Sequence, residues 1–152
     1  MRTVIYGRRR APAPLPKFWR PKLEEGTKLH VKIAHHDLVA RLADGTATLA
    51  DLWDWMETGF TYSQMMRMLH EDGECFTQEA EQAIAAQLDT YPAVCQRLRI
   101  TRKAWLEPAE LDIARQAAMV FDALIDLDRN GIAVAAVEWS DAQMASIRRV
   151  HG

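Results

Sequence analysis

The sequence predicts an all-α fold, a single-domain helical bundle of about six helices with an extended Pro/Arg-rich N-terminal arm. Apolar residues recur at three- and four-residue spacing through most of the chain, and hydroxyl residues stand in capping positions before several of these segments. No set of alternating segments is suited to a sheet. With 152 residues, 49% of them hydrophobic, the chain can bury one core. We assign residues 1–26 to the arm and residues 27–152 to the bundle domain.

The arm carries the strongest charge feature of the chain. Residues 1–22 contain seven basic and no acidic residues, whereas the remainder has twelve basic and 21 acidic residues, a net charge of −9. Prolines at positions 12, 14, 16 and 21 remove backbone donors and favour extended geometry. The arm could lie on nucleic acid, clamp an acidic protein surface, another copy of the chain included, or wrap the acidic body. Its predicted contact residues are Arg8, Arg9, Arg10, Lys17, Phe18, Trp19 and Arg20.

The first half of the bundle is expected to contain three helices. The first runs from about Lys28 to Ala43, and Asp44-Gly45 ends it. Thr48 caps the second helix, with an acidic residue three positions later, and Gly59 is expected to stop it. Thr61 begins a second capping box and predicts a short helix through Leu69.

The second half begins with a helix that Thr77 caps and that runs to about Tyr91. Pro92 is expected to break or kink it, because proline lacks the amide hydrogen, and a further helical stretch reaches about Arg102. Pro108 lies in the first turn of the next helix. Residues 132–139, IAVAAVEW, stay open between a buried helix and a strand, and Ser140 with Gln143 caps a last helix.

The hexapeptide DLDRNG, residues 126–131, matches the first half of a calcium-binding loop. Position twelve of such a loop needs a bidentate glutamate, but Val137 stands there and Glu138 comes one residue too late. We therefore interpret this segment as a helix C-terminus in which Asn130-Gly131 adopts left-handed geometry. No metal ion or cofactor is expected.

Two further motifs have competing interpretations. The helix after Thr48 and the helix at Thr61 could form a DNA-binding helix-turn-helix, although the acidic first helix would repel phosphates, or they could be two core helices meeting at a corner. His35 and His36 point about 100° apart on a helix, so we interpret them as core or interface histidines rather than joint metal ligands. No pattern nominates a nucleophile with a base, and we expect no enzymatic activity.

The most distinctive apolar concentration is rich in methionine and tryptophan, between Trp53 and Met68. Most of it should be core. Trp55 and Met68 fall off the main apolar stripes of their helices, and flexible methionine beside tryptophan suits an adaptable contact surface. We therefore predict that Trp55 and Met68 contact a partner.

Hydrophobic runs, the N-terminal segment and the cysteine content together indicate the cellular compartment. No apolar run approaches the roughly 20 residues of a membrane span, and the basic N-terminus lacks the apolar segment of a secretory signal. Cys75 and Cys95 form no disulfide framework, which favours a reducing compartment. We expect a bacterial cytoplasmic protein without membrane contact.

The opening MRTVIYGRRRAPAPLPKF, and ELDIARQAAMVFDALIDL followed by a short apolar stretch and a final helix, resemble short helical proteins of proteobacterial phages and integrative elements. The resemblance implies a setting in which small proteins bind and redirect a host or element protein, inhibitors of bacterial defence such as anti-CRISPR proteins included. We expect a non-catalytic interaction protein of this kind, with self-association left open. The alternative is a nucleic-acid-binding accessory or regulatory protein that uses the basic arm.

Overall fold

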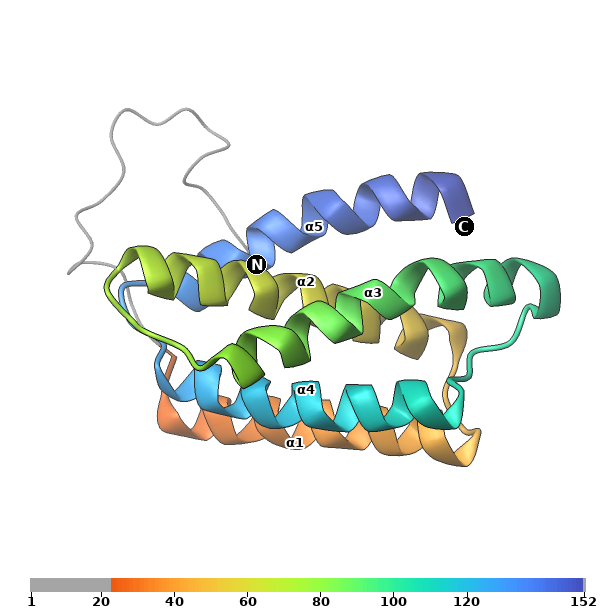
Figure 1. The fold of residues 1–152 in the computed structure, drawn as a ribbon, viewed down its shortest axis with the longest axis horizontal. Helices are drawn as coiled ribbons and strands as arrows, with labels where there is room; N and C mark the ends of the chain where they lie inside the picture. Colours follow the sequence, from red (N-terminus) through yellow and green to blue (C-terminus); the bar gives the residue numbers. More distant parts are fainter. Residues whose placement is uncertain (1–22, 152) are drawn as a thin grey trace.

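The computed structural model describes residues 23–151, and these residues form five α-helices without a strand (Figure 1). The all-α prediction is confirmed, with five helices rather than about six. The predicted arm contacts Arg8, Arg9, Arg10, Lys17, Phe18, Trp19 and Arg20 lie outside the described residues. The helices are α1 (Glu25–Asp44), α2 (Leu49–Glu71), α3 (Gln78–Thr101), α4 (Pro108–Asp126) and α5 (Ile132–His151).

Helix α2 is the centre of the bundle and contacts each of the other four helices. In Figure 1, α5 lies along one side of α2, while α1 and α4 run side by side along the other, and α3 packs against both α2 and α4. None of the helices in the described part of the chain is long and apolar enough to cross a membrane.

Local capping signals place several helix ends correctly. The Thr48 hydroxyl accepts from the Asp51 amide at 3.2 Å while the Thr48 amide donates to the Asp51 carboxylate at 2.8 Å, which is the predicted capping box. The Thr77 hydroxyl accepts from the Ala80 amide. Gly45 follows α1 with a φ of 84°, a left-handed conformation that glycine adopts without strain.

The predicted stop at Gly59 is wrong, because α2 continues through it to Glu71. Gly59 instead lies where α3 crosses α2, and a Cβ atom there would be 1.9 Å from the Tyr91 hydroxyl. Thr61 is inside the same helix, and its hydroxyl donates to Ser140 Oγ at 2.7 Å rather than capping a new helix. The helix-turn-helix interpretation is therefore wrong as well.

Two further predicted helix boundaries, at Pro92 and at Ser140, are absent from the structure. Helix α3 continues through Pro92, whose exposed ring lies on the outer side while Tyr91, Val94 and Cys95 are buried against the bundle. Packing on both sides of the proline compensates for the missing amide donor. Residues 132–139 are helical, and Ser140 is inside α5, where its hydroxyl donates back to the Val137 carbonyl at 2.9 Å.

The DLDRNG segment connects α4 to α5 as a helix end. Asn130 and Gly131 have φ angles of 56° and 71°, as the helix-stop interpretation predicts. Asp128 is only 4% exposed, and its carboxylate accepts from the Ala133 amide and from the Leu23 amide, both at 2.8 Å. Asp126 instead pairs with Lys32 on α1. Within the described residues, no group of three or more potential ligands is placed to hold a metal ion.

Asp128→Ala should lower the free energy of unfolding by about 1–3 kcal/mol, because the buried Ala133 amide and the partly buried Leu23 amide lose their acceptor. Thermal melts with calcium and with a chelator should show the same decrease in melting temperature, since the carboxylate accepts hydrogen bonds from backbone amides and does not bind an ion. The control is Asp126→Ala, which removes an exposed ion pair and should change stability little. A calcium-dependent rise in melting temperature that Asp128→Ala abolishes would restore the calcium interpretation.

Candidate functional site

Trp55 and Met68, the two predicted contact residues within the described chain, are not at an open surface. Trp55 is 2% exposed and packs edge-on against Tyr91 with ring centroids 5.1 Å apart. The prediction of a surface tryptophan is wrong, because four helices surround α2 and bury residues outside its main apolar stripe. Met68 is partly buried and packs against the core cluster of Tyr62, Met65 and Leu69.

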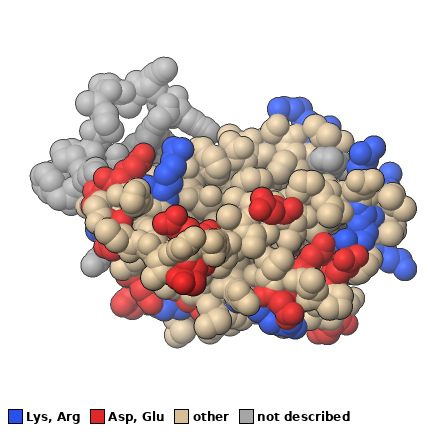
Figure 2. All heavy atoms as spheres, in the orientation of Figure 1, with Lys and Arg blue, Asp and Glu red and all other residues tan. Residues whose placement is uncertain are grey.

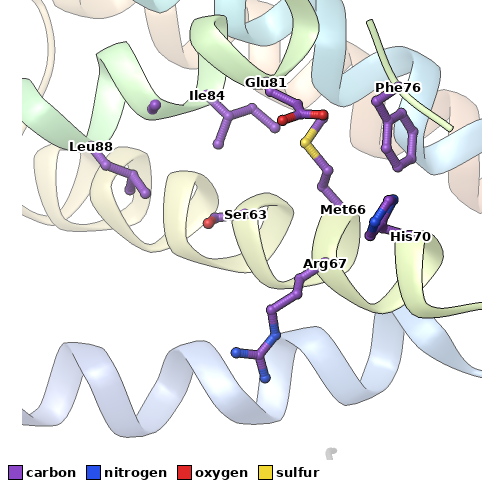
Figure 3. Close-up of a pocket in the computed structure, with 9 residues that line it drawn as sticks. Ser63, Met66, Arg67, His70, Phe76, Glu81, Ile84 and Leu88 are labelled. Atoms are coloured by element: carbon purple, nitrogen blue, oxygen red, sulfur yellow. The ribbon is translucent and has the colours of Figure 1, made fainter. Parts of the chain in front are cut away.

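The same methionine-rich stretch nevertheless borders a groove between α2 and α3 (Figure 3). Its volume is about 300 Å³, at the lower end of the range for ligand pockets. Helix α2 contributes four of its lining residues, the α2–α3 connection one, and α3 four. They are Ser63, Met66, Arg67, His70, Phe76, Glu81, Ile84, Ala85 and Leu88.

The floor of this groove is apolar. Met66 and Ile84 are almost fully buried beneath it, and Phe76 and Leu88 are half-buried at its two ends. In Figure 3 the Met66 side chain reaches toward α3, whereas Arg67 extends from the opposite side of α2. Methionine is flexible and polarisable, so Met66 can adapt to the shape of an entering side chain.

The rim of the groove carries polar and charged groups. His70 and Glu81 line it and are exposed. The His70 imidazole is within hydrogen-bond distance of the Glu74 carbonyl, 3.1 Å from Nδ1, which holds the ring beside Phe76. An apolar floor with a polar rim is the arrangement that accepts apolar side chains of a peptide or helix and orients their polar neighbours.

A second cavity, between α1, α2 and α5, has a different character. It measures about 240 Å³ and is lined by polar and acidic residues, including Asp54, Thr58, Tyr62 and the buried His35. Burial lowers the pKa of His35 to about 4, so this imidazole is neutral at physiological pH. Its ring packs edge-on against Tyr62 and Phe121. His35 is therefore a core residue, as predicted.

His36 and the acidic turn after α2 form ion pairs between elements of the fold. His36 is half-exposed, and its Nε2 lies 2.7 Å from Asp122 on α4. Arg129 in the α4–α5 connection donates to Asp72 at 2.8 Å and to Glu74 at 3.0 Å. The acidic turn after α2 thus fixes the connection that leads into α5.

Sequence reasoning located the methionine-rich stretch but missed the groove itself. Phe76, Ile84 and Leu88 carry no motif, and they become neighbours of Met66 only because α2 runs straight past Gly59 and lies against α3. No protein-family model, no curated protein and no solved structure matches this chain.

Proposed function

We propose that this chain is a non-catalytic interaction protein that binds another protein through the α2–α3 groove. The observation that carries the proposal is the groove itself, a cavity of about 300 Å³ with a floor of Met66, Phe76, Ile84 and Leu88. Burial of one or two apolar side chains there contributes roughly 1.5–3 kcal/mol each, enough to anchor a partner.

The groove also defines the chemistry of the partner segment. The groove lies between two antiparallel helices, α2 and α3 (Figure 1), and this arrangement suits an amphipathic helix whose apolar residues recur every three or four positions. Glu81, an exposed residue of α3 at the rim, can pair with a cation beside those apolar residues.

The setting that we propose follows from the sequence resemblance to short helical proteins of phages and integrative elements. A small cytoplasmic protein of such an element would act by occupying a surface of a host or element protein. Proteins of bacterial defence systems belong to this class of partner.

The test is Ala85→Trp, because Ala85 is an exposed residue of α3 that lines the groove. An indole at this position should fill the cavity without disturbing the core. The tagged chain is first used to co-purify a partner from the native host, and the affinity is then measured by calorimetry. We expect Ala85→Trp to weaken binding at least about tenfold, which corresponds to roughly 1.4 kcal/mol.

The matched control is Ala93→Trp, an exposed alanine of the same helix outside the groove. Both variants should keep the melting temperature of the parent chain, and Ala93→Trp should keep its affinity. Equal affinity of Ala85→Trp and the parent chain would show that the partner binds elsewhere.

A further inference from the structure

The cations of the described chain divide into two groups by their partners. Twelve basic residues follow the arm. Six of them form ion pairs with acidic residues, and these are Lys28, Lys32, Arg41, Arg97, Arg115 and Arg129. Five of the other six are exposed at the C-terminal ends of α3 and α5, without a carboxylate partner among the described residues. These five, named here the basic end, are Arg99, Arg102, Lys103, Arg148 and Arg149.

Both parts of the basic end lie at the same end of the molecule (Figure 1). Helices α3 and α5 stop at the same end of the molecule (Figure 1), and Ile147 of α5 packs against the core cluster that contains Leu98 of α3. Figure 2 shows blue side chains gathered at this end of the visible face. A single ligand that covers both helix ends in Figure 1 can contact cations of both parts.

Stabilisation of the helix ends does not account for this many cations. Each helix C-terminus carries about half a negative charge, so the two ends together attract about one cation. Arg97, which lies one turn before the end of α3, is neutralised by Glu110 and stacks on Trp105 at 4.4 Å. The five cations beyond it remain in excess, and their like charges repel one another in the absence of an anion.

We infer that the basic end is a binding surface for the phosphate backbone of nucleic acid. An exposed pair between one cation and one protein carboxylate contributes little, because water and salt screen it. A nucleic acid instead holds a dense row of phosphates with condensed counterions, and each neutralised phosphate releases counterions. Solvated arginine and lysine side chains outside a pocket are suited to this sequence-independent contact. The surface is separate from the groove proposed above.

The test uses the full chain and fluorescence anisotropy with a random-sequence duplex of about 20 base pairs, at about 50 mM and about 200 mM salt. The parent chain should bind with an affinity that falls steeply with salt. R148Q/R149Q and R99Q/R102Q/K103Q should each weaken binding, and should reduce the slope of log affinity against log salt by about 0.9 for each lost contact.

The control variant is K32Q/R115Q, which removes the same charge as R148Q/R149Q from cations that are already paired on α1 and α4. It should bind like the parent chain, and Ala85→Trp should too, which separates this surface from the groove. Absence of binding at the lower salt concentration overturns the inference, as does an unchanged salt slope in the basic-end variants. The same assay is also run with anionic phosphatidylserine vesicles, because Ile100 and Val150 are exposed beside these cations. Polyglutamate is added as an acidic polypeptide. Binding to either of them, but not to nucleic acid, also overturns it.

Discussion

Gly59→Ala should destabilise the protein by about 2–4 kcal/mol, although it adds only one methyl group. In an exposed helix the same substitution stabilises by roughly 0.5–1 kcal/mol, because glycine loses more backbone entropy on folding. The sign reverses here because the new Cβ would lie 1.9 Å from the Tyr91 hydroxyl and 2.9 Å from Gln87 Nε2. No side chain can be accommodated at that separation without movement of α3 away from α2.

Tyr91 is held too firmly to make room. Its hydroxyl donates to the Met56 carbonyl at 2.9 Å and accepts from Gln87 Nε2 at 3.0 Å. Its ring is in edge contact with Trp55 and Phe60, at centroid distances of 5.1 and 5.3 Å. Displacing it therefore breaks buried hydrogen bonds and opens the packing of the central helix pair.

A double-mutant cycle isolates this contact. Tyr91→Phe removes the oxygen that clashes, so the double variant should be more stable than the sum of the two single effects by at least about 1 kcal/mol in urea unfolding. The control is Gly26→Ala on α1, where a Cβ would meet no atom within 4 Å, and it should be neutral or stabilising. Wild-type stability of Gly59→Ala would show that α2 and α3 do not approach this closely.

Helix boundaries that are set by local hydrogen bonds or by a left-handed residue could be predicted from sequence, whereas positions inside a helix that carry the same signals were mistaken for boundaries. Thr48 and Thr77 cap through hydrogen bonds that span three residues, so the signal is local. Gly59, Pro92 and Ser140 carry the local signals of a stop or a start, yet residues distant in the chain decide their conformation. Gly59 is needed for the approach of Tyr91, and Ser140 is inside a helix that packs along α2.

The candidate sites show the same limit. Hydrophobic periodicity identifies a core stripe on each helix, but it does not say how many neighbours a helix has, and a central helix buries residues outside that stripe. Trp55 was misassigned for this reason. Which cations make up the basic end could not be predicted either, because their neutralisation depends on pairs such as Lys32–Asp126, 94 residues apart.

Trp55→Ala should lower the free energy of unfolding by about 3–5 kcal/mol, the usual cost of truncating a buried tryptophan. Trp55 is 2% exposed in the core cluster that also contains Leu52, Met56 and Tyr91, and its loss leaves a large cavity at the centre of the bundle. A surface contact residue would instead change stability by less than about 0.5 kcal/mol when truncated. Urea unfolding therefore separates the two roles without knowledge of any partner.

Two companion variants sharpen this measurement. Trp55→Phe should cost clearly less than Trp55→Ala, because the ring still fills most of the space and the indole Nε1–H, which has no hydrogen-bond partner among the described residues, is removed. Met68→Ala, at a partly buried position of the same helix, should cost about 1 kcal/mol. If Trp55→Ala unfolds at the same urea concentration as the parent chain but loses its partner, Trp55 is a contact residue after all. Coupled loss of stability and binding is the result expected of a core residue, since the groove is built on the helix that Trp55 anchors.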